Sequence, residues 1–146
     1  MSFNDCTAPV LLADDDRDDQ SLATEAFKRA HVTRPLRCVG DGEKLLAYLH
    51  ACAASPLPNC LPALILLDLN MPRMGGHEAL GAIRADARLR HIPVVIWTTS
   101  SEREDVAAAH AAGCDDYITK PDSFERMIEV MHALDLRWLA GGEGAE

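Results

Sequence analysis

Short, continuous apolar runs alternate along the chain with stretches in which apolar residues recur at helical spacing. The runs have strand length and occupy residues 10–13, 36–39, 63–67, 93–97 and 117–119. Between them, apolar side chains recur at i, i+3, i+4 and i+7, as expected of helices that bury one face. Because the runs are continuous rather than alternating, both faces of the sheet should be covered. The pattern therefore predicts an α/β domain in which five parallel strands alternate with five helices.

Turn and capping signals separate these predicted elements. Three prolines within residues 55–62 predict a loop before the third strand. Ser101 and Glu104 have the spacing of a capping box, which predicts the start of the fourth helix. Gly113 predicts the end of that helix, because glycine readily adopts the left-handed conformation of a C-cap.

The composition fits one domain with an aliphatic core. The 146 residues are 48% hydrophobic but only 5% aromatic. This length matches a single domain, and no repeat or linker interrupts the pattern. We therefore predict one domain over residues 8–139 and a flexible tail over residues 140–146, which offers little to pack.

Charge and cysteine usage restrict the expected partners and compartment. The net charge of −9 argues against nucleic acid and anionic membranes as partners, because both favour a basic surface. No apolar run approaches the roughly 20 residues of a membrane helix, and the first residues do not resemble a signal peptide. The five cysteines are scattered without a C-x-x-C pair, which favours a reducing cytoplasm over a disulfide framework. We expect a cytoplasmic protein.

Polar side chains follow four of the five predicted strands. They are Asp14 and Asp15 after the first strand, Asp68 after the third, Thr98 after the fourth and Lys120 after the fifth. Ligands of open parallel sheets bind beyond the carboxyl ends of the strands, so these groups should share one rim. The neighbouring Asp16, Asp18 and Asp19 are interpreted as acids that favour the start of the first helix.

Carboxylates gathered at one rim require a compensating charge. Oxygen ligands without clustered cysteine or histidine indicate Mg²⁺ rather than Zn²⁺. A carboxylate can also act as a nucleophile and form an aspartyl-phosphate, and Asp68 has the central position for this role. Lys120 would offset charge on the transferring group, and Thr98 offers it a hydroxyl donor.

Four segments together resemble the receiver domain of two-component response regulators. They are residues 10–16 (VLLADDD), 66–76 (LLDLNMPRMGG), 93–98 (PVVIWT) and 112–121 (AGCDDYITKP). The resemblance covers residues 8–138 and implies a flavodoxin-like, doubly wound (βα)5 sheet of strand order 2-1-3-4-5. Within the family, the insert at residues 51–62, the Thr98-Thr99-Ser100 run and the extended last helix resemble single-domain regulators of cyanobacterial and bacterial phytochromes.

The resemblance implies a role for each residue at the rim. Asp68 would be the phosphoacceptor, with Thr98 and Lys120 contacting the phosphoryl group. Mg²⁺ would be held by the Asp15 and Asp68 carboxylates, by the backbone carbonyl of Asn70, and by Asp14 through a water. Tyr117 would move with Thr98 as the switch. The donor would be a sensor histidine kinase, and the likeness to phytochrome regulators implies one of the phytochrome type. The domain would catalyse only its own phosphorylation and dephosphorylation.

Two other functions remain open at this point. A Mg²⁺-dependent phosphohydrolase also uses an aspartate nucleophile after a strand, but it usually has an acid two residues on, where this chain has Asn70. A nucleotide- or flavin-binding domain would need a glycine-rich phosphate loop after the first strand, where this chain has acids.

The end of the last predicted helix carries large apolar residues. Trp138 and Leu139 lie just beyond the stripe formed by Met131 and Leu134. We interpret them as an exposed apolar patch and predict a homodimer through this helix and the adjacent face. The alternative is that they fold back on the core.

Overall fold

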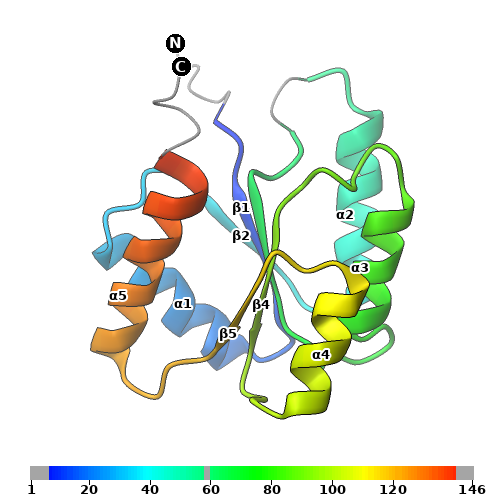
Figure 1. Ribbon diagram of the computed structural model, residues 1–146. Helices are drawn as coiled ribbons and strands as arrows, with labels where there is room; N and C mark the ends of the chain where they lie inside the picture. The colour runs from blue at the N-terminus through cyan, green and yellow to red at the C-terminus, as the bar shows by residue number, and fades with distance from the viewer. Residues whose placement is uncertain (1–6, 58–59, 141–146) are drawn as a thin grey trace.

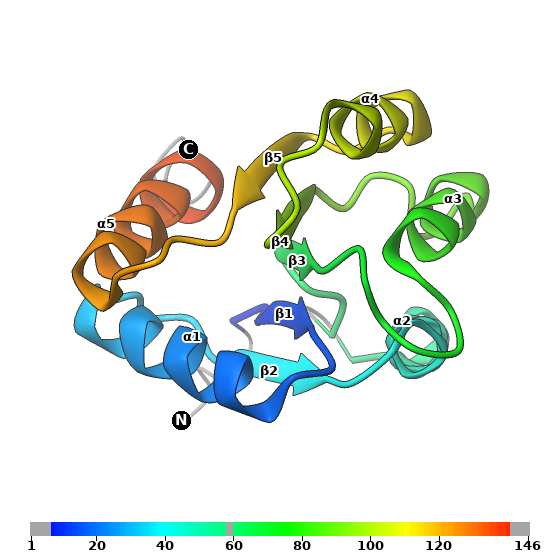
Figure 2. The same cartoon turned by 90° about the horizontal axis from the view of Figure 1, so that it is seen from below.

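A computed structural model describes residues 7–57 and 60–140. Its five parallel strands form one sheet between two layers of helices (Figure 1). The strand order is β2-β1-β3-β4-β5 (Figure 2), which confirms the predicted fold and strand order. The strands are β1 (Val10–Ala13), β2 (Leu36–Val39), β3 (Leu64–Leu67), β4 (Val94–Thr98) and β5 (Asp116–Thr119). Each lies within one residue of its predicted position, and the three central strands are apolar runs that follow proline, or one residue after it, and end at a polar residue.

Helices cover both faces of the sheet. They are α1 (Arg17–Arg29), α2 (Gly42–Ala54), α3 (Gly76–Ala85), α4 (Arg103–Ala112), α5 (Phe124–Leu134) and the π-helix η2 (Asp135–Ala140). Figure 2 shows α1 and α5 on one face of the sheet and α2, α3 and α4 on the other. Residues 141–146 of the predicted tail lie outside the described residues.

Successive strand residues point to opposite faces and build two separate core clusters. Leu11, Ile65 and Ile96 contribute to the cluster beneath α2, α3 and α4. Leu12 and Trp97 contribute to the cluster beneath α1 and α5. The central strands β1, β3 and β4 are buried at every position because helices cover both faces of the sheet, whereas the edge strands β2 and β5 are only partly buried and carry Arg37 and Asp116.

The prediction of an exposed apolar patch at the end of the last helix is wrong for Leu139. This side chain is only 2% exposed and joins the cluster beneath α1 and α5, and Trp138 packs partly against the same cluster. Leu134 and Leu139 are five residues apart, and a π-helix brings residues at this spacing to the same side. Leu136, which points away, is 58% exposed.

The predicted capping box at the start of α4 is also wrong. The helix begins at Arg103, and its N-cap residue Glu102 makes no side-chain capping hydrogen bond. Ser100 takes part in its place: its hydroxyl accepts from the Glu102 N–H at 3.3 Å and donates to Asp105 at 2.5 Å. The predicted end at Gly113 is confirmed, where φ is 104°. Within the described residues, no helix combines the length and apolarity needed to cross a membrane.

Candidate metal and phosphoryl site

Backbone hydrogen bonds continue the sheet beyond the strand ends and fix the polar residues that follow. The Asp68 N–H donates to the carbonyl of Ala13 at 3.0 Å, and the Lys120 N–H donates to the carbonyl of Thr98 at 2.7 Å. Asp14 is held in the same way by the carbonyl of Val39 at 3.0 Å. The rim at the carboxyl ends of the strands is therefore built on rigid backbone.

Three carboxylates converge at this rim. Asp14, Asp15 and Asp68 each place a carboxylate oxygen within 4.8 Å of the other two. Asp14 is fully buried and Asp68 is 6% exposed, whereas Asp15 is exposed to solvent. Two acids of the cluster are therefore buried, and the third lies at the surface.

Lys120 reaches into this cluster from the end of β5. Its Nζ lies 2.8 Å from Asp14 Oδ2, 2.8 Å from Asp19 Oδ2 and 3.1 Å from Asp68 Oδ2. Burial opposes the charge of Lys120, but its hydrogen bonds to Asp14 and Asp19 and the nearby charge of Asp68 outweigh burial and raise its pKa. Lys120 is therefore a fixed cation at neutral pH.

One ammonium group does not balance the acids around it. Burial raises the pKa of Asp14, and the hydrogen bond from Lys120 offsets only part of this shift. Asp15 and Asp68 add further negative charge within the cluster. A compact set of hard oxygen ligands with surplus negative charge suits a divalent metal ion, so the donor set fits the metal inferred from the sequence.

The predicted switch residues lie beside the cluster on β4 and β5. The Thr98 side chain is fully buried, and its Oγ1 accepts from the Ser100 N–H at 3.4 Å. Tyr117 is half-buried, and its hydroxyl donates to the Ser100 carbonyl at 2.8 Å. Both side chains therefore contact the β4–α4 loop, through Ser100.

Asp19 and Gln20 also contact this site, although no site role is predicted for either from the sequence. Asp19 was interpreted as an acid at the start of a helix, but it also forms an ion pair with Lys120. Gln20 Nε2 donates to the backbone carbonyl of Asp14 at 2.6 Å. Both residues lie in the first turn of α1, which begins at the same rim, and that placement is the signal that could have identified them.

The backbone of Gly76, the first residue of α3, packs directly against the backbone of Asp68 and Leu69. A Cβ on Gly76 would lie 2.4 Å from the Asp68 carbonyl oxygen and 2.8 Å from Leu69 Cα. Asn70 is exposed, and its N–H donates to Asp68 Oδ1 at 3.2 Å. The backbone on both sides of Asp68 is therefore tightly restrained.

Replacing Gly76 with alanine should destabilise the protein, because backbone atoms cannot yield as a side chain would. We expect Gly76→Ala to lower the free energy of unfolding by about 1–3 kcal/mol, measured by urea denaturation. Gly81→Ala in the same helix is the matched control, since a Cβ there meets nothing within 4 Å. Alanine at that position should be neutral or stabilising. Equal effects of the two substitutions would contradict the steric argument.

The fold is a flavodoxin-like domain whose acidic cluster at the carboxyl edge of the sheet could hold a metal ion. The sequence matches the family described as the response regulator receiver domain over residues 10–132. This chain belongs to that family, which places it in two-component signalling.

Individual relatives agree with this assignment. The chain is 35% identical over 130 residues to the probable methanogenesis regulatory protein FilR2 of Methanothrix harundinacea, covering 89% of this chain and 83% of that protein. It is 33% identical over 133 residues to the response regulator Rcp1 of Synechocystis, covering 89% and 88%. The crystal structure of the phosphorylated cyanobacterial phytochrome response regulator RcpA superposes with a TM-score of 0.81 at 31% identity, covering 92% and 95%. The resemblance to phytochrome response regulators is thereby confirmed.

Proposed function

We propose that Asp68 accepts a phosphoryl group from a phosphohistidine of a sensor kinase. The observation that carries this proposal is the position of Asp68. Its carboxylate lies in the acidic cluster and is only 3.1 Å from the ammonium of Lys120. It is 6% exposed, so little of this residue contacts solvent.

In the proposed transfer, an oxygen of Asp68 attacks the phosphorus in line with the leaving imidazole. The P–O bond forms as the P–N bond breaks, and the released imidazole takes up a proton from solvent. Lys120 offsets the negative charge on the transferring group. Asp15, Asp68, the carbonyl of Asn70 and, through a water, Asp14 would hold Mg²⁺. The ion, when bound, supplies further neutralisation of the phosphoryl oxygens.

We propose that phosphorylation is transmitted through Thr98 and Tyr117. The Thr98 hydroxyl would donate to a phosphoryl oxygen on Asp68 and so leave its contact with the Ser100 N–H. Tyr117 shares Ser100 as a hydrogen-bond partner, so a shift of this loop would change the position of its ring. The phosphoryl group would thereby favour one of two arrangements of the α4–β5–α5 surface.

The kinase partner that we propose is of the phytochrome type. The names of Rcp1 and RcpA place those relatives among response regulators, RcpA in a phytochrome pathway. The net charge of −9 agrees with a protein partner rather than nucleic acid, because nucleic acids bind basic surfaces. We place this exchange in the cytoplasm, where the kinase domain and reduced cysteines would be found.

We also propose a homodimer through α5 and the adjacent face. Leu136 is exposed, and a hollow of about 410 Å³ lies between β5 and α5, lined in part by Ile118, Val130 and Trp138. Apolar groups of this kind favour association. Sedimentation should show a dimer at micromolar concentration, and a monomer at high concentration with or without a phosphoryl mimic would refute the proposal.

Removing divalent metal should abolish phosphoryl transfer. The chain would be incubated with a panel of labelled histidine kinases, phytochrome kinases included, in excess EDTA and after addition of Mg²⁺. We expect labelling in Mg²⁺ and a fall of about 100-fold or more in EDTA, because three carboxylates would face the incoming phosphoryl group with only Lys120 as counter-charge.

The same preparation separates the two phosphoryl-transfer functions. Undiminished labelling in EDTA would contradict the metal role, and failure with every kinase would contradict the receiver role. A phosphohydrolase would turn over p-nitrophenyl phosphate rapidly with Mg²⁺, whereas we expect no such turnover because Asn70 cannot act as the general acid.

A further inference from the structure

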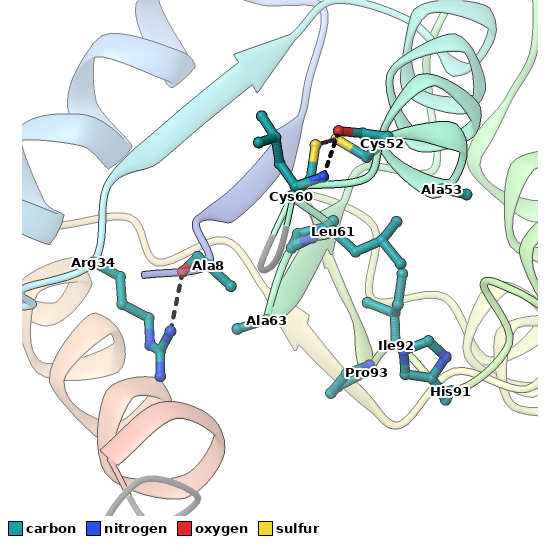
Figure 3. A pocket seen from close by; sticks show the side chains of 13 residues that line it. Ala8, Arg34, Cys52, Ala53, Cys60, Leu61, Ala63, His91, Ile92 and Pro93 are labelled. Atoms are coloured by element: carbon teal, nitrogen blue, oxygen red, sulfur yellow. Dashed lines mark hydrogen bonds between the residues drawn. The ribbon is translucent and has the colours of Figure 1, made fainter. Parts of the chain in front are cut away.

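Two cysteines that are separate in the sequence meet at the amino ends of the strands. Cys52 lies in the last turn of α2 and Cys60 in the loop before β3, and Figure 3 shows their side chains pointing toward each other. Their Sγ atoms are 2.6 Å apart. The other cysteines of the described residues do not pair: Cys38 is exposed, and Cys114 lies near His110.

We propose that Cys52 and Cys60 form a reversible intramolecular disulfide by exchange with a small-molecule disulfide such as oxidised glutathione. The two sulfurs are in contact while both residues keep their place in the fold, so the bond requires no rearrangement of α2 or β3. The pair is also asymmetric, since Cys52 is 8% exposed and Cys60 is half-buried. This difference sets the order of reaction.

A pocket gives the oxidant access to the pair. It has a volume of about 540 Å³ and is lined by both cysteines together with Leu61, His91 and Pro93 (Figure 3). Cys60 would react first, because burial and the adjacent Cys60 raise the pKa of Cys52 to about 11 and leave it a poor nucleophile at neutral pH.

The disulfide forms in two successive thiol–disulfide exchange reactions. The Cys60 thiolate attacks one sulfur of the small disulfide, whose S–S bond breaks and releases one thiol. Cys52 then loses its proton and attacks the Cys60 sulfur of the mixed disulfide, which forms the Cys52–Cys60 bond and releases the second thiol. The protein loses two protons and two electrons, and the small disulfide takes up both to become two thiols.

The cysteine pair is independent of the phosphoryl site. The residues around the pocket include Ala8, Ala63 and Pro93, which precede β1, β3 and β4, whereas Asp68 follows β3 at the other end of the strand. The disulfide would tie the end of α2 to the start of β3 without touching the acidic cluster. It would restrict the loop between them and thereby stabilise the folded chain.

Oxidised glutathione tests the proposal on the full chain. We expect the folded protein to lose the mass of two hydrogen atoms, to fall from five free thiols to three, and to yield a cross-linked peptide containing Cys52 and Cys60. Its melting temperature should rise by about 5 °C. Excess dithiothreitol should reverse each change, and phosphorylation of Asp68 should be unaffected.

Single substitutions distinguish the two cysteines. Cys52→Ala should trap a stable glutathione adduct on Cys60, Cys60→Ser should leave Cys52 unmodified, and Cys38→Ser, the matched control, should still form the cross-link. Should Cys52→Ala fail to fold, the wild-type cross-link in folded and urea-unfolded chain remains decisive. The proposal is overturned if the folded chain accumulates a lasting adduct on Cys60, or if the cross-link forms only after unfolding.

Discussion

Asp68→Asn should leave the chain folded but reduce phosphoryl transfer by about 100-fold or more. The amide has nearly the same size as the carboxylate, so it can keep its place at the end of β3. Its oxygen is a far weaker nucleophile, and the substitution also removes one of the three converging carboxylates. The measurement is incorporation of label from a phosphorylated histidine kinase in Mg²⁺.

Asp18→Asn is the matched control for this loss. It makes the same chemical change in α1, near the same rim, on a side chain that is exposed and outside the acidic cluster. We expect labelling like that of the wild type, and circular dichroism should show that both variants keep their helices. Label incorporated equally by Asp68→Asn and wild type would mean that another residue accepts the phosphoryl group.

Trp97→Ala should cause the largest loss of stability among single core substitutions. Trp97 lies in β4, is 1% exposed and packs in the cluster beneath α1 and α5. Truncating a fully buried large side chain removes its transfer free energy and leaves a cavity, which together cost about 3–5 kcal/mol. The melting temperature should fall by about 10 °C for a domain of this size.

This loss should be followed by far-ultraviolet circular dichroism, because the substitution removes one of only two tryptophans. Leu22→Ala is the control, since that side chain in α1 is 46% exposed and its removal leaves no cavity. We expect a change within about 0.5 kcal/mol there. A similar small change for Trp97→Ala would mean that the core around β4 collapses to fill the space.

The sheet could be predicted from residue pattern, but its strand order could not. Continuous apolar runs such as residues 64–67 indicate strands buried on both faces, and the prediction held for all five strands. Periodicity does not say which strands are neighbours, so the order 2-1-3-4-5 came from resemblance to a family. The end of the last helix was misjudged because spacing by 3.6 residues does not anticipate a π-helix, which turns Leu139 into the core.

At the site, the residues that could be predicted are those placed by strand ends. Asp14, Asp68 and Lys120 each follow a strand directly, and parallel strands deliver their carboxyl ends to one rim. An acid such as Asp19 in the first turn of a helix is explained by the helix start alone. Its ion pair with Lys120 is therefore visible only in the three-dimensional structure. The meeting of Cys52 and Cys60 depends on the path of a proline-containing loop, which no periodic pattern describes.

The π-helix at the end of α5 affects how the protein can be cut or fused. Since Leu139 fills a place in the core beneath α1 and α5, a truncation after Leu134 would uncover apolar surface that η2 now covers. A reporter or affinity tag joined at that point would replace the segment that closes this layer. The earliest junction that leaves the layer closed is therefore beyond Ala140, the last residue of η2.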